Sequence, residues 1–211
     1  NWRRHAKVPI LVLNATTLNT GHNWQFTASW MGEPPADTDS TIDGNDRLRR
    51  LYYDDAAVQP VNHRRVRLGD AVAASACVPG LFEPLVLADL YPEQSPHMTV
   101  RLVDGGVHDN QGLSALLEQD CTVLLVSDGS GQMDTQDDPS SGLLSVPLRT
   151  NTILMARVRE AEYREIAARR RASLLRGLLY IHLKDDIPGR RLNWREYNEA
   201  PDPDDPLKTN S

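Results

Sequence analysis

Residues 101–112 read Arg-Leu-Val-Asp-Gly-Gly-Val-His-Asp-Asn-Gln-Gly, an apolar run that ends abruptly in a carboxylate and two glycines. The apolar residues predict a β-strand ending at Asp104, and the polar residues after the glycines predict the start of a helix. Ligands gather at strand ends in open α/β sheets, so Asp104 is a candidate pocket-facing acid on a Gly105–Gly106 turn. The structural alternative is that Asp104 only caps a tight strand-to-helix turn.

Length and composition indicate an ordinary globular domain. The chain has 211 residues, 40% hydrophobic and 25% charged, and we expect one domain over residues 1–184. Residues 185–211 are polar, rich in Pro and acids, and predict a tail without a core. The net charge of −6 argues against a nucleic-acid partner. No apolar segment approaches the roughly 20 residues of a membrane span.

The N-terminus and the cysteines are the features that indicate the cellular location of the protein. Residue 1 is Asn rather than Met, and no signal-peptide pattern follows, so we expect a cut end. The predicted location is the cytoplasm or a peripheral position on a membrane. Cys77 and Cys121 each lie in an apolar run, which predicts buried, reduced thiols rather than a bridge.

Several apolar runs predict strands of an α/β fold. Residues 8–18 form a near-continuous run, typical of a strand buried on both faces of a parallel sheet. Residues 24–30 alternate like a half-buried strand. The strand ending at Asp104, a helix over residues 110–119 and a strand over residues 121–127 predict a βαβ unit with a right-handed crossover.

Two helices are predicted besides residues 110–119. Residues 68–78 are mostly small and predict a tightly packed central helix that Asp70 caps and that Pro79–Gly80 ends. Ser75 or Cys77 there could be a nucleophile, but neither sits on a glycine-flanked elbow, so packing is favoured.

The helix predicted over residues 149–176 carries many charged residues. Its polar positions hold Arg157, Arg159, Arg164, Arg169, Arg170, Arg171 and Arg176 against Glu160, Glu162 and Glu165. A basic helical face can meet anionic lipid. A solvated face with i,i+4 ion pairs is the favoured interpretation. One more strand is predicted over residues 178–183.

Other motifs are weak or absent. The acidic stretch at residues 32–47 predicts a solvated polar loop, and none of the six histidines is singled out as a catalytic base. No G-x-S-x-G elbow and no glycine-rich phosphate loop appears. Metal coordination is one interpretation of Asp104, His108 and Asp109, because Asp and His are both metal ligands. The sequence offers no second, remote set of ligands to complete such a site. We therefore predict no cofactor and no metal.

Three stretches together carry a family resemblance. Residues 12–21 read Val-Leu-Asn-Ala-Thr-Thr-Leu-Asn-Thr-Gly, residues 71–82 read Ala-Val-Ala-Ala-Ser-Ala-Cys-Val-Pro-Gly-Leu-Phe, and residues 104–110 read Asp-Gly-Gly-Val-His-Asp-Asn. In this order they resemble the strand and turn, the Ala-Ser-x-x-x-Pro-x-x-Phe helix and the Asp-Gly-Gly motif of patatin-like phospholipases. Residues 132–211 add little to the resemblance.

The resemblance implies a lipid acyl hydrolase with a Ser–Asp dyad. Asp104 matches the dyad acid, and Gly105 and Gly106 match its turn. The family's serine and oxyanion loop lie N-terminal to these motifs and are missing here. The implied fold is a three-layer α/β/α sandwich with a mostly parallel sheet, incomplete in this chain. The implied substrate is a lipid or acyl ester, with peripheral membrane contact, and the chain alone is expected to be inactive.

Two other hypotheses stay open. The first is a non-catalytic module that binds lipid or a partner through the same fold and has lost the serine elbow. The second is a metal-dependent hydrolase that uses Asp104, His108 and Asp109.

Overall fold

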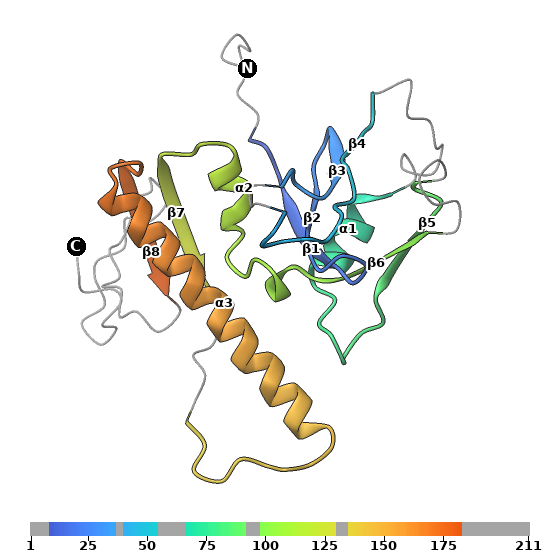
Figure 1. Ribbon diagram of the computed structural model, residues 1–211, viewed down its shortest axis with the longest axis vertical. Helices are drawn as coiled ribbons and strands as arrows, with labels where there is room; N and C mark the ends of the chain where they lie inside the picture. The colour runs from blue at the N-terminus through green and yellow to red at the C-terminus, as the bar shows by residue number, and fades with distance from the viewer. Residues whose placement is uncertain (1–8, 37–39, 55–65, 92–97, 130–134, 183–211) are drawn as a thin grey trace, which may run out of the picture.

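A computed structural model describes residues 9–36, 40–54, 66–91, 98–129 and 135–182 (Figure 1). The strands form two separate sheets. A curled six-stranded antiparallel sheet has the order β4-β3-β2-β1-β6-β5, and β7 pairs with β8 in parallel. The first sheet consists of β1 Leu13–Thr17, β2 Asn23–Phe26, β3 Trp30–Gly32, β4 Leu51–Tyr52, β5 Leu85–Ala88 and β6 Thr99–Asp104. The remaining elements are α1 Leu68–Ser75, the 3-10 turn η2 Gly105–Val107, α2 Leu113–Glu118, β7 Val123–Asp128, α3 Ser145–Arg171 and β8 Gly177–His182.

The first sheet grows by tight hairpins. Residues 18–22 join β1 to β2, with Gly21 at φ 79° and the Thr17 N–H donating to the His22 carbonyl over 3.0 Å. Glycine suits this turn because a side chain is strained at positive φ. A second hairpin joins β2 to β3, so the alternating pattern of residues 24–30 is two strands rather than one.

The core of the first sheet lies between its strands and α1. Trp24, Met31 and Leu51 are fully buried, and α1 places Ala71 and Ala74 against them. Small helix side chains allow this close approach to the sheet, as the sequence predicted. The predicted central position is wrong, because Leu68 and Val72 are exposed, and the helix ends at Ser75 rather than at residue 78. Asp70 is the third residue of α1 rather than the residue before it, and its carboxylate accepts the Arg67 N–H at 2.8 Å. It stabilises the helix start as one half of a capping box.

The second core lies between α3 and the parallel pair. Leu124 and Val126 of β7 pack with Ile166 of α3, Leu113 of α2 and Leu175. β7 therefore alternates strictly, with Val123 and Leu125 on the opposite, exposed face. No described helix is both long enough and apolar enough to cross a bilayer.

The predicted mostly parallel α/β/α sandwich is wrong. β1 is antiparallel to both of its neighbours, and among the described strands the parallel pairing is confined to β7 and β8. A connection as short as residues 18–22 can join only antiparallel strands, because a parallel pair needs a crossover of a dozen residues or more. The apolar run at residues 8–18 was misleading, since Ile10 and Leu11 are exposed and the strand begins at Leu13.

The predicted βαβ unit from the strand ending at Asp104 to the strand at residues 121–127 is also wrong. β6 is paired on one edge with β1 and on the other with β5, so β7 has no edge of β6 to join. The βαβ unit of the structure is instead β7-α3-β8. The predicted tail at residues 185–211 lies outside the described residues, so nothing tests its boundary with residues 1–184.

The alternation of buried and exposed residues along β7 leads to a prediction about folding stability. Leu124→Ala leaves a cavity in the second core and should lower the free energy of unfolding by about 2–4 kcal/mol. Leu125→Ala, on the exposed face, should change it by less than about 0.5 kcal/mol. Urea denaturation followed by circular dichroism measures both, and equal losses would contradict the orientation.

Candidate functional site

The backbone of Asp104 is fixed from two sides. Its N–H donates to the carbonyl of Cys77, just beyond α1, over 2.8 Å. Its carbonyl accepts the Thr16 hydroxyl of β1 over 2.9 Å. Asp104 is the last residue of β6, as the pattern at residues 101–112 predicted. It is held between the segment that follows α1 and the neighbouring strand β1.

The Asp104 side chain both caps a turn and presents a carboxylate oxygen. Oδ1 accepts the N–H of Gly106 at 2.7 Å, and this bond caps η2. No hydrogen bond to Oδ2 is found within the described residues, and the side chain is half-buried. The capping interpretation is therefore confirmed, and it leaves one oxygen of an oriented carboxylate available to another group.

Gly105 and Gly106 are required by the space around the turn. A Cβ on Gly105 would lie 2.5 Å from the Asn14 carbonyl oxygen of β1. A Cβ on Gly106 would lie 2.7 Å from Asn110 Oδ1 and 3.0 Å from the terminal methyl carbon of Met155 on α3. Gly105 lets the turn lie against the backbone of β1, and Gly106 lies against side chains that include Met155 of α3.

Asp109 is a structural acid. Its carboxylate is buried and accepts the N–H groups of Leu113 and Ser114 at 2.8 and 2.9 Å, at the start of α2. Its own N–H donates to the Gly105 carbonyl over 2.9 Å and closes the turn. Asp109 therefore joins the Asp104 turn to the helix that follows.

The metal-site hypothesis finds no support in this geometry. Asp104 and Asp109 each accept backbone N–H groups, and no cluster of three or more His, Cys, Asp or Glu residues within the described ranges could hold a metal ion. Burial lowers the pKa of His108, although the nearby Asp109 opposes the shift. The imidazole is therefore neutral at pH 7.

Cys77 has a packing role, as the sequence favoured. Its thiol is buried and donates to the Glu83 carbonyl at a distance of 2.9 Å. Ser75 is half-buried in the last turn of α1. Cys77 and Cys121 are both free, and Cys121 is only partly buried.

No sequence pattern predicted a buried cluster that is centred on His22. Its Nδ1 lies 3.2 Å from Glu33 Oε2 and its Nε2 lies 2.8 Å from Asp43 Oδ2. Glu33 is itself buried and accepts the Thr17 hydroxyl and the Leu48 N–H. The acidic stretch at residues 32–47 is therefore not a plain solvated loop. Scattered charges give no signal of this cluster, because turns bring His22 and the two acids together.

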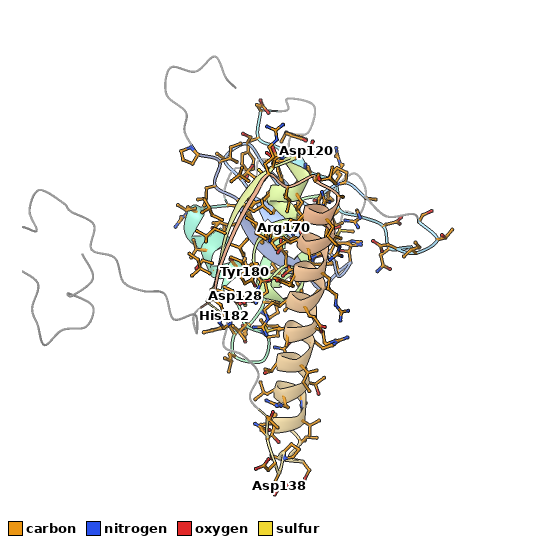
Figure 2. All side chains as sticks on the ribbon, turned by 90° about the vertical axis from the view of Figure 1, so that its left-hand side faces the viewer. Asp120, Asp128, Asp138, Arg170, Tyr180 and His182 are labelled. Carbon is orange, nitrogen blue, oxygen red and sulfur yellow. The ribbon has the colours of Figure 1, made fainter. Side chains whose placement is uncertain are left out.

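A second polar cluster lies at the carboxyl ends of the parallel strands, where Figure 2 labels Asp128, Tyr180 and His182. Asp128 is buried and accepts the Tyr180 hydroxyl at 3.1 Å. Arg159 of α3 lies 3.7 Å and His182 lies 3.9 Å from the same carboxylate oxygen. Burial, followed by Asp128, raises the pKa of Tyr180 to about 12, so the phenol stays protonated and bound.

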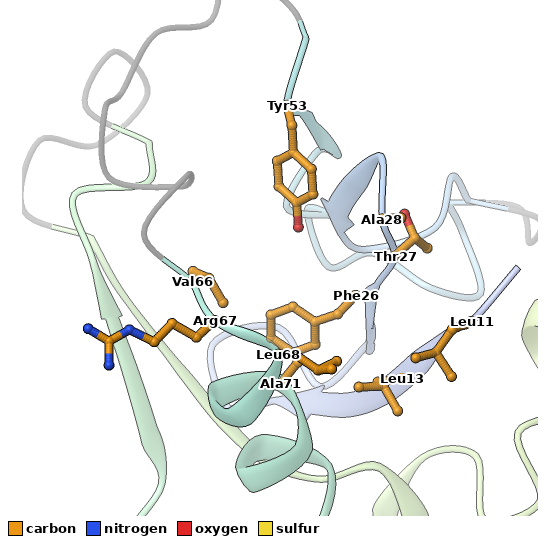
Figure 3. A pocket seen from close by; sticks show the side chains of 10 residues that line it. All are labelled: Leu11, Leu13, Phe26, Thr27, Ala28, Tyr53, Val66, Arg67, Leu68 and Ala71. Carbon is orange, nitrogen blue, oxygen red and sulfur yellow. The ribbon is translucent and has the colours of Figure 1, made fainter.

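An open, mostly apolar groove of about 430 Å³ lies beside the first turn of α1 (Figure 3). Its walls include Leu11, Leu13, Phe26, Tyr53, Leu68 and Ala71. Asp104 lies at the other end of α1, next to Cys77, and does not line the groove. The volume is in the range of small-molecule sites.

Comparison with known proteins adds no identification. No protein-family model matches the chain, and no curated protein matches it either. The resemblance to patatin-like phospholipases rests on the three quoted stretches alone.

The glycine turn makes a second stability prediction. Gly105→Ala forces a methyl group against the Asn14 carbonyl and should lower the free energy of unfolding by about 1–3 kcal/mol. Gly69→Ala is the matched control, since a Cβ there meets nothing within 4 Å and Gly69 lies in α1. Alanine is a better helix former, so the control should be neutral or stabilising. Chemical denaturation that ranks the two variants in the reverse order would contradict the packing of the turn.

Proposed function

We propose that this chain is part of a serine acyl hydrolase that acts on lipid esters, with Asp104 as the acid of a Ser–Asp dyad. The observation that supports the proposal is the orientation of the Asp104 carboxylate. The Gly106 N–H holds Oδ1, and Oδ2 has no hydrogen bond within the described residues. The serine is proposed to come from polypeptide outside these 211 residues, because no G-x-S-x-G occurs in them.

In this mechanism Oδ2 of Asp104 accepts the hydrogen bond of the serine hydroxyl. As the serine oxygen attacks the ester carbonyl, its proton passes to the carboxylate, which then returns it to the leaving alcohol. A carboxylate is a weak base in water, so orientation and exclusion of water must supply the gain. The hydrogen bonds that fix the Asp104 backbone and Oδ1 supply the orientation.

The groove beside α1 supports a lipid rather than a polar ester as substrate. Its walls are largely aliphatic and aromatic, which suits an acyl chain. α1 connects the groove to the region of Asp104, because the segment that follows the helix accepts the Asp104 N–H.

The dyad predicts a specific loss of activity. In the natural polypeptide that contains this sequence, Asp104→Asn should lower kcat for a short acyl ester by about 10²–10⁴-fold, because the amide cannot accept the serine proton. Asp120→Asn is the matched control, since Asp120 is exposed and has φ 53°, which Asn tolerates. Its activity should be unchanged.

The 211-residue chain alone should show no turnover. Turnover by this chain that survives Asp104→Asn would rule out the dyad. The alternative is a non-catalytic lipid- or partner-binding module. An absence of turnover and of labelling by a serine-reactive phosphonate in the natural polypeptide would decide for that module.

We also propose peripheral membrane contact through the beginning of α3. Figures 1 and 2 show this half of α3, together with the loop that leads into it, extending away from the sheets. It exposes large apolar side chains, and Arg149 is the one charged residue between positions 143 and 156. The most exposed on the helix are Leu148 and Leu154, and Leu143 and Leu144, immediately before the helix, are more exposed still. The arginines that follow on α3 suit an anionic surface, although three of them pair with Glu160 or Glu165.

Vesicle binding tests this contact. The Leu143→Ser/Leu144→Ser variant should bind vesicles of phosphatidylcholine and phosphatidylglycerol at least about tenfold more weakly than the original chain, because two apolar side chains no longer enter the bilayer. Leu125→Ser is the control, since Leu125 is also strongly exposed but lies on β7. Co-sedimentation that is the same for all three proteins would exclude the contact.

A further inference from the structure

α3 crosses directly over the turn that carries Asp104. Met155 lies against Gly106, where an added Cβ would be 3.0 Å from its methyl carbon. Glu162 follows about two helical turns later and faces Asp109, at the other end of the turn. One side of α3 therefore braces both ends of residues 104–109.

The carboxyl group of Glu162 is buried in an unusual setting. Neither of its oxygens is exposed, and neither makes a hydrogen bond of ordinary geometry within the described part of the chain. The group faces the Asp109 carboxylate and the backbone N–H groups of Asn110 and Gln111. Burial, followed by the interaction with Asp109, raises the pKa of Glu162 to about 9. The side chain is therefore a neutral acid at pH 7.

Asp109 is the natural acceptor of the Glu162 proton. Its carboxylate already accepts the Leu113 and Ser114 N–H groups, which stabilise its negative charge. A neutral Glu162 facing this carboxylate can donate a hydrogen bond, whereas an ionised Glu162 would place two negative charges side by side away from water.

We propose that Glu162 is a positioning residue that, as a neutral carboxylic acid, donates its proton to Asp109 in a hydrogen bond and holds α3 against the Asp104 turn. We call this contact between Glu162 and Asp109 the clamp. The evidence for the clamp is the set of contacts between α3 and the turn. Its importance for ester hydrolysis rests on the function proposed for Asp104.

The other charged and titratable groups near Glu162 do not account for a change of charge near pH 9. From β7 and β8, Asp128 and Tyr180 bind each other, and Tyr180 has a pKa of about 12. On α3 itself, Arg159 lies beside Asp128. On the turn, burial lowers the pKa of His108, so it is already neutral above pH 7. Among these described neighbours, Glu162 is the group that changes charge near pH 9.

The pH dependence of folding stability follows from the difference in the pKa of Glu162 between the folded and the unfolded chain. The pKa of Glu162 is raised in the folded state, so the unfolded chain loses this proton at lower pH than the folded chain does. The stability that the proton contributes is fully present below the ordinary glutamate pKa and is lost as the pH rises through about 9. Above that pH the loss is complete.

The test compares Glu162→Gln with Glu160→Gln. The side-chain amide of the Glu162→Gln variant can still donate to Asp109 but does not ionise, whereas Glu160 is partly exposed and pairs with Arg157 and Arg164. The urea midpoint of the unaltered chain should match that of Glu162→Gln near pH 5, fall below it progressively up to pH 9, and then run parallel to it. Folding at pH 7 should take up about one proton more in the unaltered chain than in Glu162→Gln. Glu160→Gln should follow the unaltered chain.

Carboxyl carbon NMR gives a direct readout that does not depend on activity. One glutamate signal should titrate near pH 9 and be absent in Glu162→Gln. In the natural polypeptide, ester hydrolysis should fall on the alkaline side of about pH 9, and Glu162→Gln should remove that fall. If the NMR and stability results hold while no hydrolysis is found, the clamp stands and the proposed function fails.

Two outcomes overturn the clamp. The first is a Glu162 signal that titrates near the ordinary glutamate value. The second is an increase in melting temperature with Ca²⁺ or Mg²⁺ that Glu162→Gln abolishes, because the two carboxyl groups would then share a cation instead of a proton.

Discussion

β6 is hydrogen-bonded along both of its edges, to β1 and to β5, and this double pairing determines where the following elements can lie. With no free edge beside it, the chain leaves the sheet at Asp104 and turns between β1 and α3. Gly105 makes that path possible because a Cβ there would lie 2.5 Å from the Asn14 carbonyl oxygen of β1. β7 must then pair elsewhere, and it does so with β8 after the long crossover through α3.

α3 consequently connects two parts of the protein that share no sheet. Its Ile166 is buried in the core beneath β7 and β8, whereas Met155 and Glu162 contact the turn at the end of β6. Ion pairs at i,i+3 and i,i+4 line its solvent side, as the charge pattern predicted. Its first turns project beyond the described body and leave large apolar side chains uncovered, which is the physical basis for the proposed membrane contact.

Three of the buried acids are compensated by hydrogen-bond donors. Glu33 accepts a hydroxyl and a backbone N–H, Asp109 accepts two N–H groups, and Asp128 accepts the Tyr180 hydroxyl. Burial of a charge without such partners is costly. Glu162 differs because it faces another carboxylate and is held neutral instead. Asp104 differs again, because one of its oxygens is compensated and the other has no hydrogen bond among the described residues.

Local features could be predicted because they depend on neighbours in the chain. The strand ending at Asp104, the glycine turn, the small-residue helix α1 and the charged face of α3 all follow from patterns a few residues long. Strand direction could not be read from the apolar run at residues 8–18, because hydrophobicity records burial and not the identity of the paired strand. The environments of His22 and Glu162 escaped prediction for the same reason. Residues far apart in the sequence create them, so only the tertiary structure placed one between two acids and made the other a neutral carboxylic acid.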